Sequence, residues 1–239
     1  MRRLWTIAVV AAVAALVACG ARERSVDSSL PSASAAPGSP STSASQPDDA
    51  LTLRYGDVTQ RTIDINADGR NTTAAVAGMN AFAVDLFKAV GARQSDNVVV
   101  SPYSVTFALS MMYAGSRGQT ATEMAEVLHA GIPAEAWQEG INAYDLTLDA
   151  RTTGSPTTWA AANKVWTAPG LALRSEFLDV LTGAYGSPLA EADFAADPDA
   201  QRALINGWVA EQTNERIPEL FSSDALTSQT VMVLVNAVA

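Results

Sequence analysis

The chain has 239 residues, enough for one or two ordinary domains. Its formal net charge of −10 argues against a nucleic-acid-binding protein, because phosphate contacts need clustered lysine and arginine. A single cysteine and a single histidine exclude an internal disulfide and a zinc site built from these two residue types. The sequence also shows no spaced cluster of carboxylates, so neither a metal site nor a cofactor is expected.

Residues 1–18 have the pattern of a secretory signal peptide. Two arginines precede the apolar stretch Leu4–Val17, which is too short to span a bilayer comfortably. The run Leu16-Val17-Ala18-Cys19 is similar to the lipobox of bacterial lipoproteins, in which the signal is cut before a cysteine that carries lipid. An ordinary signal peptide with a chance cysteine is the alternative. We expect a secreted bacterial protein whose lipidated Cys19 anchors it at the cell surface, since two or more acyl chains hold stably.

Residues 19–72 are expected to comprise the lipidated cysteine and a disordered tether. The part up to about residue 50 is rich in serine, alanine, proline and glycine, and cannot bury enough apolar surface to offset the entropy of ordering. Residues 51–72 are ambiguous, because Leu51–Tyr55 alternates like a short strand. The folded domain is expected to span residues 73–239.

Apolar residues at helical spacing predict a series of helices in this domain. They cover residues 79–90, 105–115, 124–128, 137–148, 177–185 and 198–209. Thr120-Ala121-Thr122-Glu123 fits a capping box at the start of the third helix, and Asp197-Pro198 fits the start of the last one. Gly186 fits the end of the fifth helix. Residues 157–167 and 230–235 predict strands.

The stretch Asn97–Ser104 leads into the second helix, around which the domain is organised. Its β-branched first half predicts a strand, Ser101 can cap the helix, and Pro102 suits the first helical position. The spacing of four apolar residues predicts the buried face of this helix: Val105, Ala108, Leu109 and Met112.

The strand at residues 230–235 is an apolar run without alternation, which predicts burial on both faces. Such a strand needs neighbours on both sides, yet the sequence ends at Ala239. We therefore expect the domain to be incomplete at its C-terminus.

Four stretches in this order resemble the N-terminal half of a serpin, the family of serine protease inhibitors. They are residues 97–109 (NVVVSPYSVTFAL), 115–128 (GSRGQTATEMAEVL), 206–220 (NGWVAEQTNERIPEL) and 230–238 (TVMVLVNAV). Gln119 stands where the family usually has asparagine, and Asn214 where it has glycine. The resemblance implies an α+β fold in which serpin-like helices pack on a mainly antiparallel central sheet.

The resemblance also implies a mechanism. A serine or cysteine protease cleaves an exposed reactive loop and is acylated by it, and the loop then inserts as a new strand into the central sheet. Residues 230–238 match the receiving edge of that sheet, but the loop itself would lie beyond Ala239. We therefore expect this chain not to inhibit alone. A non-inhibitory surface lipoprotein, or a truncated remnant with a binding or structural role, is the alternative.

Three polar residues match the family's shutter region below the sheet: Ser101, Ser104 and, on the strand, Asn236. In an apolar place they must bond one another or lose about 1–3 kcal/mol each. Ser101 is equally a helix cap, Ser104 could bond a carbonyl one turn back, and Asn236 could face solvent. An enzyme is not expected, because the sequence has no nucleophile elbow and no phosphate loop. His129 reads as a helix-end dipole partner rather than a base.

Overall fold

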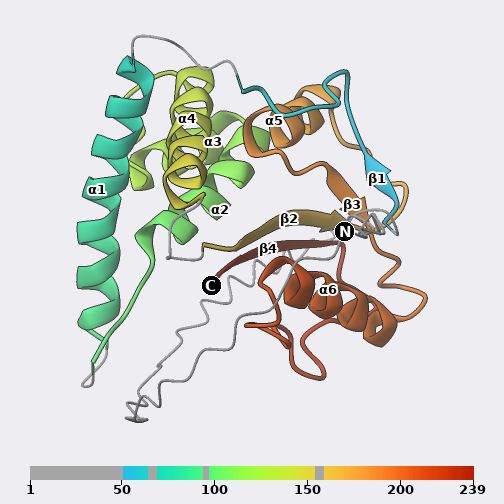
Figure 1. The fold of residues 1–239 in the computed structure, drawn as a ribbon. Coiled ribbons are helices and arrows are strands. Elements are labelled where there is room, and N and C mark those ends of the chain that lie inside the picture. Colours follow the sequence, from blue (N-terminus) through green and yellow to red (C-terminus); the bar gives the residue numbers. More distant parts are fainter. Residues whose placement is uncertain (1–50, 64–68, 94–96, 154–158) are drawn as a thin grey trace, which may run out of the picture.

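The computed structural model describes residues 51–63, 69–93, 97–153 and 159–239 (Figure 1). The signal peptide, Cys19 and the expected tether up to residue 50 lie outside the described residues. The described helices are α1 (Arg70–Gly91), α2 (Pro102–Gly115), α3 (Gly118–Val127), α4 (Ala134–Thr152), α5 (Ser175–Tyr185) and α6 (Pro198–Gln212). The described strands are β1 (Leu53–Arg54), β2 (Ala161–Thr167), β3 (Leu189–Glu191) and β4 (Met232–Val238).

The four strands form one sheet in the order β1-β3-β2-β4. Strand β2 pairs antiparallel with β4 from Ala161 opposite Val238 to Thr167 opposite Met232. Strand β3 is parallel to β2, and β1 is antiparallel to β3. Two of the three pairings are antiparallel, which confirms the expected mainly antiparallel sheet.

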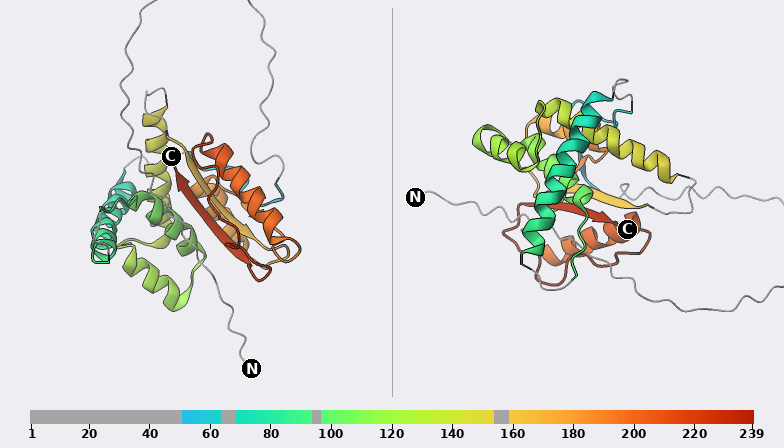
Figure 2. Two further views of the ribbon diagram at one scale, coloured as in Figure 1. Left: turned by 90° about the horizontal axis from the view of Figure 1, so that it is seen from below. Right: turned by 90° about the vertical axis from the view of Figure 1, so that its left-hand side faces the viewer.

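Helices cover the two faces of this sheet unequally (Figures 1 and 2). Helices α2 and α5 contact one face, with α1, α3 and α4 packed around them, and α6 lies against the other face. Each side has its own buried cluster: Phe107, Met111 and Trp137 are central to the first, and Trp166, Phe194 and Ile205 to the second. The expected α+β architecture is therefore confirmed.

Helix α1 is long and apolar enough to cross a membrane, judged by length and composition alone. Its buried residues nevertheless pack inside the domain, where Ala75 is fully buried and Met79 belongs to the same cluster as Trp137. Gly78 lets α4 come close, because a Cβ at this position would stand 2.8 Å from the Trp137 ring. Helix α1 thus packs one face on the domain and leaves other apolar side chains, such as Phe87, exposed.

The start of α2 confirms the local prediction, but its buried face differs from the predicted one. The Ser101 hydroxyl accepts a hydrogen bond from the Ser104 backbone N–H, and Pro102 occupies the first turn. Of the four predicted residues Ala108 is buried, whereas Val105, Leu109 and Met112 are only half-buried. The most buried apolar side chains are instead Phe107 and Met111, and three small polar residues are buried with them: Ser104, Thr106 and Ser110. The prediction failed for three of its four residues because α1, α4, α5 and β4 all contact α2, so helical periodicity does not select one side.

The expected strand at residues 97–100 is absent from the described structure, where these residues have no regular pairing. Strand β4 also differs from expectation, because its burial alternates. Val233, Val235 and Ala237 are buried on the α6 side, and the residues between them are half-buried. The prediction of burial on both faces was wrong because helices cover the α2 side of this strand only in part.

The ordered structure begins before the expected boundary at residue 73. Residues 51–63, named here the N-terminal strap, run beside α5 to the sheet edge (Figure 1) and form β1. The Val58 N–H donates to Asp179 and the Thr62 N–H to the Gly183 carbonyl, both on α5. Helix α1 starts at Arg70. Residues 51–63 of the ambiguous stretch therefore lie against the domain, and residues 70–72 belong to α1.

The predicted capping box at the start of the third helix was also wrong. Helix α3 begins at Gly118, so Thr120 lies inside the helix, and the Arg117 side chain at the cap position does not bond the N–H groups of the first turn. Glu123 instead accepts a hydrogen bond from the Gln119 amide at 2.7 Å. The ends of α5 and α6 agree with prediction: Gly186 has a φ of 60°, and Asp197 accepts from the Ala200 N–H.

Candidate functional site

The outer edge of β4 is the structural feature that fits the expected receiving edge. Ala160 and Ala239 exchange two backbone hydrogen bonds, and the Ala168 N–H donates to the Val231 carbonyl. Because bonded pairs alternate along an antiparallel ladder, the odd-numbered residues of β4 point their backbone groups at β2. The backbone groups of Met232, Leu234, Asn236 and Val238 point the other way, and no other described strand pairs with them.

An edge of this kind is a ready template for another strand, since each outward N–H and C=O needs a partner. The same residues carry the half-buried side chains of β4, on the face towards α2. An added strand would therefore extend the sheet in register and place alternate side chains on the two core clusters.

The predicted shutter residues form two separate hydrogen-bonded pairs. The Ser101 hydroxyl donates to the Ser104 hydroxyl at 3.0 Å. Asn236 is not bonded to either serine. Its amide instead donates to the side-chain oxygen of Asn163, the residue directly opposite it on β2. The structure thus brings Ser101 and Ser104 together and gives Asn236 a partner that sequence reasoning missed.

Asn163 is itself held in place, because its backbone carbonyl accepts a hydrogen bond from the Ser187 hydroxyl at 2.6 Å. Residues 163 and 236 form a non-hydrogen-bonded backbone pair, in which opposite side chains lie closest. No sequence signal could single out Asn163 alone, since its partner depends on the register between two strands far apart in the chain.

The neighbouring residue Lys164 points to the opposite face of β2, where it is 2% exposed. Its ammonium lies 5.2 Å from the centre of the Trp208 ring of α6, within cation–π range. Trp208 also meets Trp166 edge-on, with ring centres 5.8 Å apart. These contacts fix α6 across the middle of the sheet.

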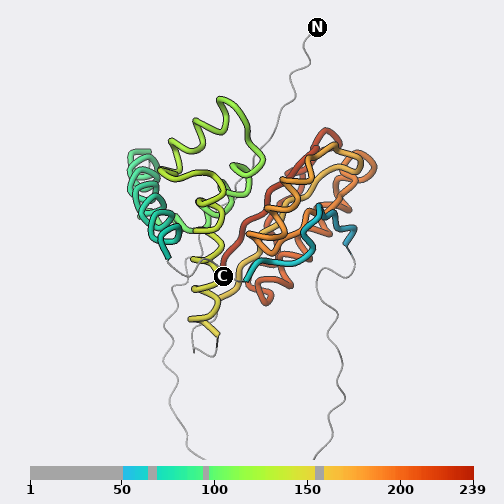
Figure 3. Tube along the Cα trace, turned by 90° about the horizontal axis from the view of Figure 1, so that it is seen from above, coloured from blue at the N-terminus to red at the C-terminus, as the bar shows by residue number. Residues whose placement is uncertain are grey.

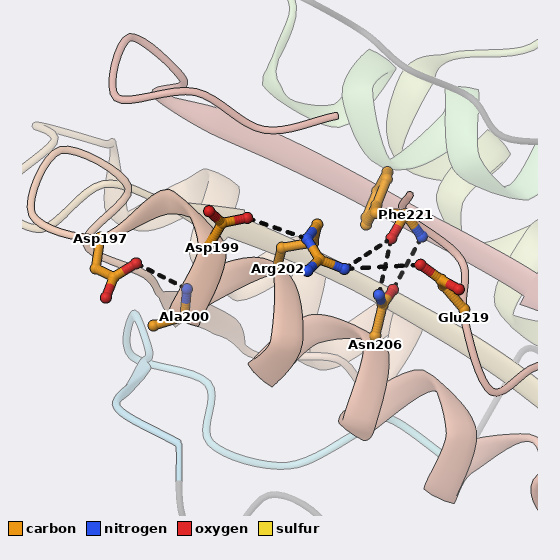
Figure 4. Close-up of polar contacts among 7 residues, drawn as sticks. All are labelled: Asp197, Asp199, Ala200, Arg202, Asn206, Glu219 and Phe221. Carbon is orange, nitrogen blue, oxygen red and sulfur yellow. Dashed lines mark hydrogen bonds and ion pairs between the residues drawn. The ribbon is translucent and has the colours of Figure 1, made fainter. Parts of the chain in front are cut away.

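The chain leaving α6 is tied back onto the helix (Figure 4). The Asn206 side chain accepts hydrogen bonds from the backbone N–H groups of Leu220 and Phe221, and donates to the Phe221 carbonyl at 2.9 Å. Arg202 donates to the same carbonyl and pairs with Asp199 and Glu219. Helix α6 and its exit segment therefore lie on the sheet as one unit beside the β4 edge.

A second polar network joins the strap to the start of α2. The Arg61 guanidinium pairs with Asp145 at 2.5 Å and donates to the Asn142 oxygen at 2.9 Å. The Tyr103 hydroxyl donates to the other oxygen of Asp145. Burial, and then the charge of Asp145, raises the pKa of Tyr103 well above its usual range.

His129 lies just after α3, on the surface of the helical layer. His129 ends α3 in a left-handed conformation with a φ of 52°, and its ring lies 2.9 Å from the Asp85 carboxylate of α1. It thus links two helix surfaces. Within residues 51–63, 69–93, 97–153 and 159–239, no group of three or more histidine, cysteine or acidic side chains could hold a metal ion.

Comparison with known proteins identifies a single family. The family model described as Serpin (serine protease inhibitor) matches residues 77–239. The chain is 37% identical over 159 residues to a leukocyte elastase inhibitor of Bos taurus, covering 66% of this chain and 41% of that protein. It is 36% identical over 196 residues to an uncharacterized serpin-like protein of Thermococcus kodakarensis, covering 82% of this chain and 44% of that one.

Solved structures agree with these sequence matches. The crystal structure of Manduca sexta serpin-12 superposes with a TM-score of 0.61 at 30% identity, over 67% of this chain and 44% of that one. A crystal structure of maspin gives a TM-score of 0.63 at 26% identity, over 72% and 44%. The chain thus spans less than half the length of the relatives it matches.

Proposed function

Since this chain belongs to the serpin family, we propose that it supplies the receiving sheet of an inhibitor of serine or cysteine proteases. The single observation that carries the proposal is the outer edge of β4, whose backbone groups are oriented to accept one more strand. Names of relatives add support, because several are called leukocyte elastase inhibitor.

In the proposed mechanism a protease attacks a reactive loop, its nucleophile becomes acylated by the cleaved loop, and the loop pairs with β4. Insertion satisfies the outward groups of Met232, Leu234, Asn236 and Val238 and carries the acylated protease with it. The 239 residues contain no stretch that the resemblance assigns to this loop. We therefore expect them not to trap a protease by themselves.

We also propose that Cys19 is lipidated and holds the protein on the outer surface of a bacterial membrane. The lipobox-like run before Cys19, and the fact that the chain has no other cysteine, support this assignment. Labelling of cells with a palmitate analogue should mark the wild-type protein and not the Cys19→Ala variant. Equal labelling of the wild-type protein and the variant would contradict the proposed lipidation of Cys19.

The inhibitory function is tested by looking for a covalent complex between the protein and a protease. The 239-residue chain and the longest reading frame that contains it are each incubated with trypsin-, chymotrypsin-, elastase-, subtilisin- and papain-type proteases. We expect an SDS-resistant complex for the longer form with at least one protease, and none for the shorter chain. Simple cleavage of both forms without a complex would contradict the proposal.

A non-inhibitory lipoprotein with a binding or structural role is the second candidate. It is favoured by the two core clusters, each of which contains fully buried aromatic side chains, Trp137 in one and Trp166 in the other. If the chain melts cooperatively and remains monomeric, this role becomes the better explanation for the 239-residue form. If it is molten or aggregates, the second candidate fails, because the β4 edge is then not protected.

A further inference from the structure

A cleft of about 720 Å³ opens away from the sheet, between the end of α2, α3, the start of α4, α5 and the strap. This volume lies in the range of sites for small organic ligands. The cleft shares no lining residue with the β4 edge or with the pairs Ser101–Ser104 and Asn163–Asn236. It therefore calls for an explanation other than strand insertion.

The inner wall of the cleft is apolar. Tyr113 and Ala114 of α2, Ala121 of α3, and Val180 and Ala184 of α5 supply most of this surface. Apart from Tyr113, which is buried, these side chains are half-buried and open to the cleft. An occupant with an apolar body would remove this surface from water.

The polar groups deep in the cleft are already paired within the protein. Gln138, which is 6% exposed, donates to the Ser110 carbonyl and accepts from the Tyr185 hydroxyl. Asn142, which is 2% exposed, accepts from Arg61 and donates to the Thr62 carbonyl at 2.8 Å. The inner wall thus offers few free hydrogen-bonding groups, which disfavours a strongly polar occupant such as a sugar.

The rim of the cleft is acidic. It carries four carboxylates, from Glu135, Glu139, Glu176 and Asp179, against the single guanidinium of Arg117. That guanidinium is turned to the Ala114 and Ser116 carbonyls at the end of α2, at 2.9 and 2.7 Å.

The carboxylates differ in how far they are already engaged. Asp179 accepts from the Val58 N–H, Glu139 from the Asn71 amide, and Glu176 from Arg174. Glu135, in the first turn of α4, makes no hydrogen bond or ion pair with another described residue. The lining of the cleft therefore has more acidic than basic side chains, and Glu135 has no partner among the described residues.

We propose that this cleft is a binding site for a small organic cation with an apolar body, such as an aromatic or alkyl amine. The apolar part fills the space between α2, α3 and α5, and the ammonium group faces Glu135 and Glu139 on α4. The charge of the rim selects a cation over an anion of the same shape. The proposal is independent of the inhibitory function, because the β4 edge takes no part in it.

Two fluorescent probes with the same apolar body and opposite charge test the proposal: dansylcadaverine, which carries an amine, and dansyl-6-aminohexanoic acid. Each is titrated into the full 239-residue chain at low ionic strength. We expect saturable, blue-shifted fluorescence with dansylcadaverine and about tenfold weaker binding of the acid. Equal affinity for the two probes, or no saturation with the amine, would overturn the proposal.

Variants locate the binding. The double variant Glu135→Gln with Glu139→Gln should weaken amine binding about three- to tenfold and strengthen binding of the acid, because it removes two negative charges from the rim. Glu211→Gln, an exposed position on α6 on the other side of the sheet, is the matched control and should change neither affinity. Ala184→Trp, which fills the cleft, should weaken both probes.

Circular dichroism establishes whether Ala184→Trp folds. If Ala184→Trp does not fold, the glutamine double variant alone tests the location of the site, because it changes surface charge with little change in shape. Amine affinity that is unchanged in the glutamine double variant, or lowered equally in Glu211→Gln, would overturn the proposal.

Discussion

The side chain of Asn236 is hydrogen-bonded to Asn163, which lies opposite it on β2. This contact distinguishes two possible groupings of the polar residues near β4. Sequence resemblance groups Asn236 with Ser101 and Ser104, whereas the structure bonds it to Asn163 and leaves the two serines bonded to each other. Both pairs satisfy polar groups that are buried or half-buried, which any shutter-like function requires.

A double-mutant cycle distinguishes the two groupings. We expect Asn163→Ala and Asn236→Ala each to cost about 1–2 kcal/mol and to be coupled by about 1 kcal/mol, because either change leaves the other amide without its partner. The same cycle between Ser104→Ala and Asn236→Ala should show coupling close to zero. Urea unfolding of the single and double variants provides the measurement, and stronger coupling of Asn236 to Ser104 would refute the structural pairing.

Residues 214 and 215 form a left-handed turn directly after α6. Asn214 follows α6 with a φ of 52°, in the left-handed region that glycine usually occupies. Asparagine is among the side chains that tolerate this region best, since its short polar group can bond locally. Glu215 follows with a φ of 60°, so the turn places two consecutive residues other than glycine in this region.

At the scale of elements, the N-terminal strap is hydrogen-bonded to both α4 and α5. Its β1 residues extend the sheet beyond β3, and Arg61 reaches inward to Asp145, whose side chain is 8% exposed. Gly186 allows this approach, because a Cβ there would stand 2.8 Å from the Arg61 side chain. The strap therefore links the helical layer to the sheet edge.

Removal of the Arg61 charge should destabilise the domain. Arg61→Met keeps most of the side-chain length but leaves the Asp145 carboxylate buried with only Tyr103 as a partner, and we expect a loss of about 2–3 kcal/mol. Arg174→Met is the matched control, because its partner Glu176 is mostly exposed and such pairs contribute less than about 1 kcal/mol. Urea midpoints compare the two, and equal effects would show that the strap is not held by this contact.

At the scale of the whole molecule, stability should respond to alkaline pH through two tyrosines. Burial raises the pKa of Tyr185, and burial together with Asp145 raises the pKa of Tyr103. The folded protein therefore keeps both phenolic protons at pH values where the unfolded chain, with tyrosine pKa near 10, releases them. This contribution to stability is complete below about pH 10 and is lost as the pH rises above it.

We expect the free energy of unfolding to fall above pH 10 by up to about 1.4 kcal/mol per pH unit for each of the two tyrosines. Urea unfolding at pH 9, 10 and 11 measures the slope, and absorbance at 295 nm reports phenolate. Tyr55→Phe, at an exposed position, should keep the slope, while Tyr103→Phe should reduce it. Full phenolate absorbance in the folded protein would contradict the prediction.

The cleft and the β4 edge are two separate surfaces of the same domain. The tube in Figure 3 shows the helical layer and the sheet with α6 as neighbouring halves that meet along α2 and β4. Strand insertion concerns the outer edge of β4, whereas the cleft lies between α2, α3 and α4 on one side and α5 and the strap on the other. Variants in the cleft can therefore be tested without disturbing the sheet.

The sequence predicted helix ends correctly where a cap or a left-handed turn of a few adjacent residues determines them. Asp197 before Pro198 starts α6, Ser101 before Pro102 starts α2, and Gly186 ends α5, because caps and left-handed turns depend on a few adjacent residues. The predicted face of α2 was wrong for three of its four residues, since this helix has neighbours on several sides. The capping box at Thr120 was wrong, since α3 starts earlier at Gly118.

The sequence by itself determined the family, the α+β class and most helix ends, because these follow from motif order, periodicity and capping chemistry within short windows. Only the tertiary structure decided the strap, the partner of Asn236 and the acidic cleft. Each of these joins residues far apart in the chain, such as Arg61 with Asp145 and Asn163 with Asn236. Strand register and helix packing set those contacts, and a one-residue change of register would alter them without any change in local pattern.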